Sequence, residues 1–295
     1  MTDHTLQPRH FFTVDLEEYF QVLAFAGVVS PEDWPRYPAR AEQSTDQLLE
    51  LLARHQARAT FFVVGWLADR APGLIQRIVR AGHEVASHSW WHRHLGTLTR
   101  QEFQEDVKQC RQRLEDIAGC RVNGFRAPSF SITPGREWAF DVLLEEGYRY
   151  DSSIFPIRRP EYGYPGAPRY PYLVERPAGT LLELPLATTS LGRFLVPAAG
   201  GGYLRHFPFA VTRRAFREHQ KARRPAMFYV HPWEIDTDQP QLPVSWLTRQ
   251  RHYRGIAKTW PRLERMLGEF RFTSVAEYYG LATEQMEAVT WPPAL

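Results

Sequence analysis

Two histidines stand four residues apart in the segment Ser-His-Ser-Trp-Trp-His, directly after a strand-like stretch. They are His88 and His92, and this spacing suits one face of a helical turn. Neutral imidazoles bind divalent transition metals, and a carboxylate from another strand would supply a third protein ligand. Three protein ligands leave a coordination position open for water. The pair therefore predicts half of a catalytic metal site.

A run of acids at the end of the first expected strand offers the missing carboxylate. In Asp15-Leu16-Glu17-Glu18, Asp15 and Glu17 share a face because side chains two apart on a strand point the same way. Two acids that face one cavity are costly unless a cation neutralises them or one acts as a base. We assign Glu17 as the metal ligand and Asp15 as the general base, with Glu18 as an alternative ligand.

Two more polar residues end later strand-like runs. Arg126 is placed to pair with Asp15 and to keep it ionised, because a nearby cation lowers the pKa of a carboxylate. The stiff turn after it, with Pro128 and Ser129, exposes backbone N–H groups that could bind an oxyanion. His231, in Val-His-Pro-Trp-Glu, can protonate a leaving amine near neutral pH and is the candidate general acid.

The surroundings of His231 leave alternatives open. Either Glu183 or Asp151, each at the end of a strand-like run, would orient its ring. The three consecutive glycines at 200–202 predict either a turn or a loop that approaches a ligand. Aromatic side chains near the polar candidates could stack on sugar faces, and these are Trp90, Trp91, Tyr203 and Trp233.

Strands and helices that alternate along the first half of the chain must position these residues. Expected strands lie at 11–15, 59–64, 83–86, 122–126 and 148–150, and expected helices at 44–55, 71–81, 99–118 and 134–146. Later elements are a strand at 180–184, a helix at 209–221, a strand at 226–231 and a helix at 254–270. This alternation predicts an α/β fold with mostly parallel strands, either a doubly wound sheet or a barrel.

Composition narrows the class of protein. The chain has 295 residues, 43% of them hydrophobic, and no break in composition that would divide it. The formal net charge is +3 with basic residues scattered among acids, which argues against nucleic acid as a partner. The first ten residues lack the apolar core of a secretory signal, no run is long enough for a membrane span, and only two cysteines occur. We expect a cytoplasmic protein.

Taken together, the motifs resemble the NodB-type polysaccharide deacetylases, a family of carbohydrate esterases. The resemblance runs from Phe12 to about Glu277 and is nearest to the subfamily found with exosortase and exopolysaccharide loci. The segments that carry it are Thr-Val-Asp-Leu-Glu-Glu-Tyr-Phe from 13, Gly-Tyr-Arg-Tyr-Asp-Ser-Ser from 147, Gly-Gly-Gly-Tyr from 200 and His-Pro-Trp-Glu from 231. Many members have two adjacent aspartates in the first motif, whereas here Leu16 follows Asp15.

The resemblance implies a single deacetylase domain over 1–295, built as a distorted (β/α) barrel of about seven strands. A loop-rich insertion at about 151–202 and a C-terminal extension from about 236 would be added to it. It also implies a divalent ion, Zn²⁺ by preference, with Glu17, His88 and His92 as ligands, Asp15 as base, Arg126 as the residue that orients the base, and His231 as acid. Pro128, Ser129, Tyr203 and Trp233 would contact the substrate.

The expected reaction is metal-dependent removal of N-acetyl groups from a hexosamine-containing polysaccharide or its precursor, with release of acetate. Two alternatives remain: a hydrolase of a small non-sugar amide on the same fold, and an inactive glycan-binding module. Because most polymeric glycans lie outside the inner membrane, a cytoplasmic enzyme would act on a cytosolic or lipid-linked intermediate. The sequence leaves the oligomeric state open.

Overall fold

The computed structural model describes residues 9–159, 162–192 and 194–281. Its main sheet contains β1 (His10–Leu16), β2 (Thr60–Val63), β3 (Glu84–Ser87), β4 (Gly124–Phe125), β5 (Tyr150–Asp151), β6 (Tyr172–Arg176), β7 (Gly179–Glu183), β10 (Met227–Val230) and β11 (Phe272–Thr273). A separate hairpin is formed by β8 (Thr188–Leu191) and β9 (Phe194–Pro197). The expected α/β fold is confirmed.

The strands follow one another in a ring-like order. The order in the sheet is β10-β1-β2-β3-β4-β5-β7-β6, with β11 paired to β1. All pairings are parallel except that of β6 with β7. An isolated parallel bridge joins Leu186, just past β7, to Met227 in β10. The seven parallel strands from β10 to β7 thus form the sheet. A single bridge, rather than a ladder of hydrogen bonds, joins the β7 end of this sheet to β10.

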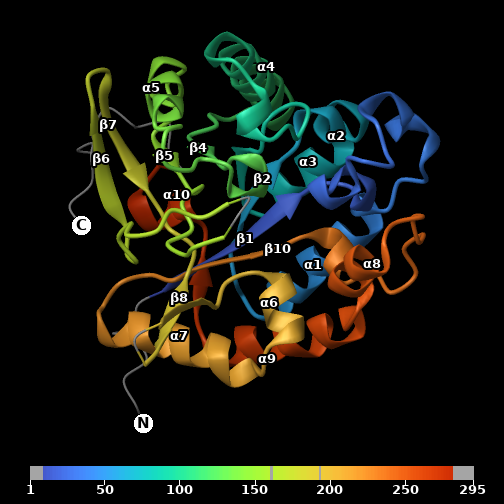
Figure 1. Cartoon of the computed structure of the whole chain (residues 1–295), viewed down its shortest axis with the longest axis vertical. Coiled ribbons are helices and arrows are strands. Elements are labelled where there is room, and N and C mark those ends of the chain that lie inside the picture. The colour runs from blue at the N-terminus through green and yellow to red at the C-terminus, as the bar shows by residue number, and fades with distance from the viewer. Residues whose placement is uncertain (1–8, 160–161, 193, 282–295) are drawn as a thin grey trace.

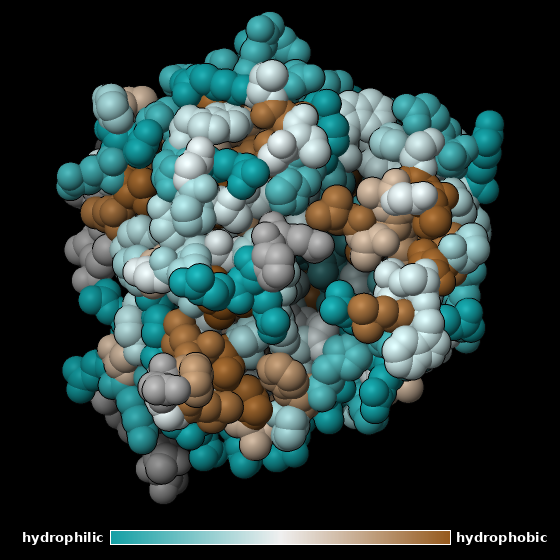
Figure 2. Space-filling model, viewed as in Figure 1, coloured by the Kyte–Doolittle hydropathy of each residue, from teal (hydrophilic) through white to brown (hydrophobic). Residues whose placement is uncertain are grey.

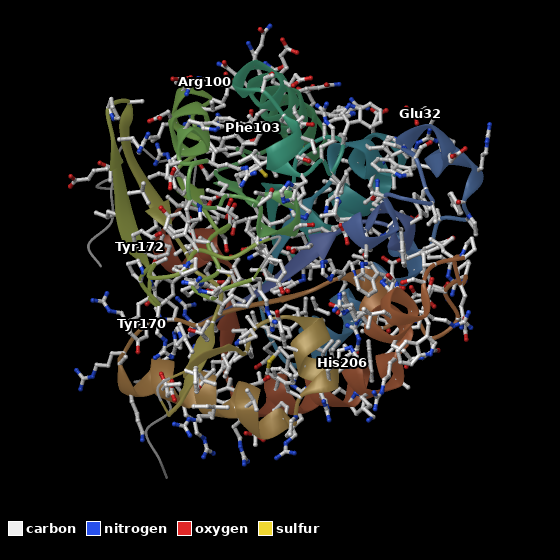
Figure 3. The ribbon with its side chains drawn as sticks, in the orientation of Figure 1. Glu32, Arg100, Phe103, Tyr170, Tyr172 and His206 are labelled. Atoms are coloured by element: carbon white, nitrogen blue, oxygen red, sulfur yellow. The ribbon has the colours of Figure 1, made fainter. Side chains whose placement is uncertain are left out.

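Helices lie outside the strands, with α7 and α9 along the lower margin of Figure 1 and α4 and α5 along the upper one. Their bounds are α1 (Ala41–Arg54), α2 (Gly65–Arg70), α3 (Pro72–Arg80), α4 (Arg100–Ala118), α5 (Trp138–Glu145), α6 (Gly201–His206), α7 (Phe209–Lys221), α8 (Trp246–Tyr253), α9 (Thr259–Glu269) and α10 (Val275–Tyr279). On α4, Phe103 packs its ring 5.6 Å from that of Phe125 in β4, whereas Arg100 in the first turn is exposed (Figure 3). This apolar face holds α4 against the sheet.

Four candidate residues occupy equivalent places in the fold. Glu17, His88, Arg126 and His231 each come directly after the last residue of a strand, namely β1, β3, β4 and β10. Parallel strands present their carboxyl ends at one edge of a sheet, so side chains at these positions gather there. Ligands bind at this edge in open α/β sheets and in barrels alike.

Several elements differ from the sequence-based expectation. The helix expected at 254–270 begins later, as α9, because Gly255 has φ +79° and ends the preceding segment. The helices α2 and α8 and the strands β6, β8 and β9 were not expected. β6 is only half-buried at the edge of the sheet, and the tip of the β8–β9 hairpin is exposed, so neither has the buried apolar run that marks a strand in sequence. Within the described ranges, no helix combines the length and the apolar character needed to cross a membrane.

Candidate metal and catalytic site

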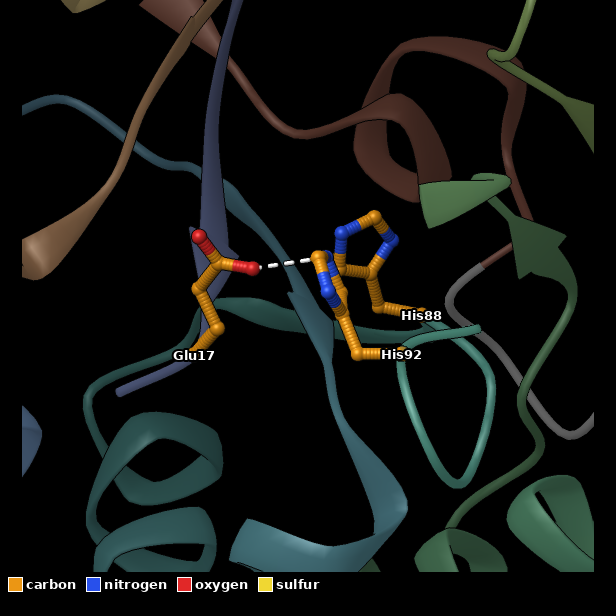
Figure 4. A group of neighbouring side chains, drawn as sticks. All are labelled: Glu17, His88 and His92. Carbon is orange, nitrogen blue, oxygen red and sulfur yellow. Dashed lines mark ion pairs between the residues drawn. The ribbon is translucent and has the colours of Figure 1, made fainter. Parts of the chain in front are cut away.

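Three predicted metal ligands meet at the carboxyl edge of the sheet. One ligand atom from each of Glu17, His88 and His92 lies within 4.8 Å of the other two, and all three residues are buried. Figure 4 shows Glu17 reaching from the end of β1 toward the two imidazole rings. Its Oε2 is 2.6 Å from Nε2 of His92, and the two ring centroids are 5.0 Å apart. The predicted convergence of one carboxylate and two imidazoles is confirmed.

The protonation states of these groups suit a cation. Nδ1 of His88 donates to the backbone carbonyl of Arg126 at 2.8 Å, which leaves Nε2 of the neutral ring without a proton. Burial lowers the pKa of His88 to about 4. Burial acts to raise the pKa of Glu17, but His92 and His231 pull it well below its usual range. A carboxylate therefore faces a neutral imidazole, as metal binding requires.

Two buried polar atoms of this group have no hydrogen-bond partner among the described residues. They are Oε2 of Glu17 and Nδ1 of His92. Although Oε2 of Glu17 lies close to Nε2 of His92, the two atoms do not have the alignment of a hydrogen bond. A bound cation would satisfy this orphaned carboxylate oxygen. Two nitrogens and one oxygen form the donor set of catalytic zinc sites, so the residues fit such an ion.

A strained loop, rather than the helical turn that the spacing suggested, carries the histidines. His92 has φ +51° and Ser89 φ +61°, in the left-handed region that non-glycine residues seldom adopt. Asp106 in α4 holds this loop, because its carboxylate accepts hydrogen bonds from the backbone N–H groups of Trp90 (2.7 Å) and Trp91 (3.3 Å). Sequence reasoning missed Asp106, since an acid within a helix carries no local signal of such a role.

Asp15 is paired with Arg126, as predicted. Nη1 of Arg126 donates to Oδ1 of Asp15 at 2.5 Å and to the hydroxyl of Thr13 at 2.8 Å. The other N–H groups of the guanidinium bond to Ser152, with Nε at 3.0 Å from its carbonyl and Nη2 at 2.9 Å from its hydroxyl. The pair is buried, and Oδ2 of Asp15 lies 3.9 Å from Nε2 of His231. The carboxylate of Asp15 is thus fixed between the guanidinium of Arg126 and the ring of His231, the candidate acid.

The partner of His231 is Glu234, which corrects the expectation of Glu183 or Asp151. Nδ1 of His231 lies 3.0 Å from Oε2 of Glu234, and the other oxygen of Glu234 pairs with Arg205. Asp151 and Glu183 instead accept hydrogen bonds from the buried backbone N–H groups just after β5, which need acceptors of their own. The three-residue spacing in His-Pro-Trp-Glu, that of a capping box, was the overlooked signal.

These charges favour the protonated form of His231 at neutral pH. Burial lowers the pKa of His231, but the carboxylates of Glu17, Glu234 and Asp15 raise it by more than burial lowers it. The resulting pKa is about 9. Burial raises the pKa of Glu234, but Arg205 and His231 lower it to about 2. Nε2 of His231 lies 3.6 Å from Oε1 of Glu17, at the inner end of the site.

The glycines at 200–202 allow the backbone to approach Glu234 closely. A Cβ on Gly201 would lie 2.2 Å from Oε2 of Glu234, and one on Gly200 would lie 2.5 Å from the ring of Tyr229. Gly200 also has φ +101°, and α6 starts at Gly201. The run is therefore the start of a helix that packs against the partner of the candidate acid.

Glu18 points away from the histidines. Its carboxylate accepts hydrogen bonds from the backbone N–H groups of Arg40 (3.0 Å) and Ala41 (3.1 Å) at the start of α1. Burial raises its pKa to about 7. Between the two acids that the sequence left open, the one that faces the imidazoles is Glu17.

A cavity of about 1040 Å³ opens above the site, and Figure 2 shows a hollow near the middle of the face viewed. Its lining includes Asp15, Glu17, His88, His92 and His231. Of the predicted substrate contacts, Ser129 and Trp233 line the cavity, and Nε1 of Trp233 donates to Glu17 at 3.0 Å. Pro128 and Tyr203 are not among the described residues that line it. The hydroxyl of Tyr203 instead lies 2.6 Å from that of Tyr162, which does.

The fold and this cluster define a class of α/β proteins with a histidine and carboxylate centre at the strand ends, and comparisons with known proteins narrow that class. Residues 32–139 match the polysaccharide deacetylase family, and residues 152–280 match a family described as a domain of unknown function. The first match contains His88, His92 and Arg126, and the second contains His231 and Glu234.

Curated relatives agree with the first match. A chitooligosaccharide deacetylase of Sinorhizobium fredii is 36% identical over 100 residues, 34% of this chain and 44% of that protein. A peptidoglycan-N-acetylglucosamine deacetylase of Listeria monocytogenes is 36% identical over 115 residues, 36% of this chain and 24% of that protein. The chain thus spans less than half the length of these relatives.

A solved structure shares the fold over nearly the whole chain. The crystal structure of a candidate polysaccharide deacetylase from Mycobacterium smegmatis superimposes with a TM-score of 0.60, at 18% identity, over 97% of this chain and 94% of that one. Residues 32–139 therefore resemble the polysaccharide deacetylases in sequence, and the solved structure shows that the chain shares their fold.

Proposed function

We propose that the protein is a metal-dependent deacetylase that removes N-acetyl groups from a hexosamine-containing polysaccharide or its precursor and releases acetate. The observation that carries this proposal is the joint placement of Glu17, His88 and His92 with a carboxylate base and a protonated histidine in one cavity. The names of two relatives support the substrate class, because one is a chitooligosaccharide deacetylase and the other a peptidoglycan-N-acetylglucosamine deacetylase.

Each residue has a role that its surroundings suit. Asp15, kept ionised by Arg126, accepts a proton from the attacking water. His231, protonated beside Glu234, donates its proton to the leaving amine. Ser129 has φ +55°, and the turn that it forms lines the cavity. The backbone of this turn faces the oxyanion that forms on the acetyl carbonyl oxygen. An amide thus breaks into acetate and an amine, with water as the other reactant.

A divalent ion, Zn²⁺ by its donor set, would be held by Glu17, His88 and His92. When bound there it would supply a Lewis acid for the acetyl carbonyl and would lower the pKa of water toward about 7. The hydrogen bond from His88 to the carbonyl of Arg126 orients the imidazole, as second-shell bonds do for histidine ligands.

Three parts of the proposal reach beyond the family itself. We propose that the substrate belongs to exopolysaccharide synthesis, as the resemblance to the exosortase-associated subfamily implies. We also propose a cytoplasmic location, which would make the substrate a cytosolic or lipid-linked intermediate. Trp233, held against Glu17 in the cavity, offers its ring as a sugar-stacking surface.

Paired variants test the metal centre directly. Zinc binding to the metal-free protein, measured by calorimetry, should weaken by more than tenfold in Glu17→Gln and remain in Glu18→Gln, because only the first acid faces the imidazoles. His92→Ala should behave like Glu17→Gln, whereas His94→Ala, two residues away on the cavity wall, should keep its zinc. Equal losses in both members of each pair would refute the assignment.

Acetate release from N-acetylglucosamine oligomers tests the reaction. Activity should disappear on chelation, return with Zn²⁺ and be lost in Asp15→Asn. Turnover of small non-sugar amides but not of the oligomers would point to the alternative hydrolase. Tight binding of the oligomers without any release of acetate would point instead to a glycan-binding module.

A further inference from the structure

The wall of the cavity above the site is rich in positive charge. Four arginines from three separate segments line it. Arg136 precedes α5, Arg158 and Arg159 follow β5, and Arg251 lies on α8. Segments far apart in sequence thus bring guanidinium groups to one opening, although the net charge of the whole chain is only +3.

Among the described lining residues, the acids do not balance these arginines. In the described lining the acidic residues are Asp15 and Glu17, and both are engaged at the floor, Asp15 with Arg126 and Glu17 with His92. Many arginines elsewhere in the chain have a carboxylate oxygen within 4.0 Å. Over residues 9–159, 162–192 and 194–281, no such pair involves any of the four cavity arginines. No carboxylate of the described residues neutralises their charge.

Contacts that bring no negative charge hold several of these residues in place. Nη1 of Arg136 donates to the hydroxyl of Thr133, and the guanidinium of Arg159 interacts with the hydroxyl of Tyr203. The backbone carbonyl of Arg251 accepts two hydrogen bonds from side chains of α6. Such partners fix the position of a side chain or of its backbone without cancelling the positive charge.

We propose that the substrate is an anionic glycan, in which a carboxylate or phosphate group lies next to the acetamido sugar that enters the site. This inference rests on the proposed deacetylase function and narrows its substrate class. The guanidinium fork matches the oxygen pairs of carboxylates and phosphates, and a cavity lined with one sign of charge concentrates ligands of the other. The oxyanion could belong to a uronate in the polymer or to the diphosphate of a lipid-linked precursor.

Three acetamido substrates separate these possibilities. They are a neutral N-acetylglucosamine tetramer, a tetrasaccharide that alternates N-acetylglucosamine with glucuronate, and the N-acetylglucosamine diphosphate ester of a short prenol. One anionic compound should bind at least about tenfold more tightly than the neutral tetramer, and this advantage should shrink as salt shortens the Debye length. Calorimetry with the zinc-loaded Asp15→Asn protein measures binding, and acetate release by the native protein measures kcat/KM. The preferred anion identifies its source.

Two arginines of α8 provide a matched pair of variants. Arg251→Gln should lower kcat/KM for the preferred anionic substrate about fivefold, in line with one exposed charge pair. Arg249→Gln, which removes an exposed charge of the same helix outside the described cavity lining, should leave it unchanged. The triple variant Arg136→Gln/Arg158→Gln/Arg251→Gln should lose the preference for the anion, with a much smaller effect on the neutral tetramer.

The inference is overturned if the zinc-loaded Asp15→Asn protein binds the neutral tetramer as tightly as both anions. It is also overturned if Arg249→Gln and Arg251→Gln have the same effect. Failure of the proposed function would look different, because no substrate would then release acetate. The calorimetric comparison would still decide whether the cavity selects anions.

Discussion

The contact between Glu234 and His231 allows a quantitative test of the candidate acid. We predict that Glu234→Gln lowers the pKa of His231 and slows acetate release, because glutamine keeps the shape of the side chain and removes its charge. The pKa of His231 is about 9, against 6.5 for an unperturbed histidine. This difference corresponds to about 3 kcal/mol in favour of the protonated ring.

Three carboxylates contribute to that value, after burial has acted against it. Glu234 is the nearest, at 3.0 Å from Nδ1, whereas Glu17 and Asp15 lie 3.6 and 3.9 Å from Nε2. An equal share would be about 1 kcal/mol, so loss of Glu234 should lower the pKa of His231 by about one unit or more. Because the folded-state pKa is raised, this contribution to stability is complete below pH 6.5 and is lost as pH rises through about 9.

Ring NMR of His231 in the metal-free protein measures the pKa, and the pH dependence of kcat measures its consequence. The falling limb of activity at high pH should move to lower pH in Glu234→Gln by as much as the pKa of His231 falls, so the loss of rate should be largest at alkaline pH. Since the variant leaves Arg205 buried without its carboxylate, a second variant, Glu234→Gln/Arg205→Met, removes both charges and guards against misfolding.

Glu183→Gln serves as the matched control, because this buried acid bonds to backbone rather than to His231. It should leave the pKa of His231 in place. The reasoning fails if that pKa is unchanged in both Glu234 variants, or if Glu183→Gln shifts it by as much.

Three further outcomes follow from the structure. Gly201→Ala should lower the melting temperature and slow turnover, since its methyl group would lie 2.2 Å from Glu234 and such overpacking costs about 1–3 kcal/mol; normal stability and rate would contradict this. Asp106→Asn should weaken zinc binding roughly tenfold in a calorimetric titration, because one acceptor of the histidine loop is lost. Burial, with repulsion from His219, lowers the pKa of His10 to about 3, and burial lowers that of His219 to about 4. The folded protein is therefore not destabilised by these histidines above pH 6.5, where both are neutral in the folded and the unfolded chain. Denaturant titrations should show the free energy of unfolding falling below that pH by about 1.4 kcal/mol per pH unit for each histidine. His219→Asn should reduce this slope.

The ligands and the candidate acid could be predicted from the sequence because each follows a strand whose own residues form a recognisable pattern. The β-branched and aromatic runs before Glu17 and His231 and the shorter buried run at 85–87 before His88 mark parallel strands, and the carboxyl ends of such strands meet at one edge. Position in the fold therefore follows from local pattern. The order in which the strands meet and the bridge between Leu186 and Met227 do not, because they depend on contacts between distant segments.

Residues that act through others were harder to predict. Asp106 reaches the histidine loop from within a helix, and Arg205 reaches Glu234 from α6, so their partners depend on how helices pack on the sheet. The predicted partners of His231, Asp151 and Glu183, are buried acids at strand ends, as the pattern required. Backbone N–H groups beside them compete for their oxygens, which a sequence pattern does not reveal.

The two family matches divide the site in a way that gives the second segment a role. Residues 32–139 contain both histidines, whereas residues 152–280, which match a family of unknown function, contain His231 and Glu234. This second segment also supplies β10, which pairs with β1 over four residue positions and so belongs to the same sheet. Three of the four cavity arginines lie in it as well. If the proposals above hold, differences in substrate among relatives should follow residues 152–280, while the metal chemistry stays with the histidine loop.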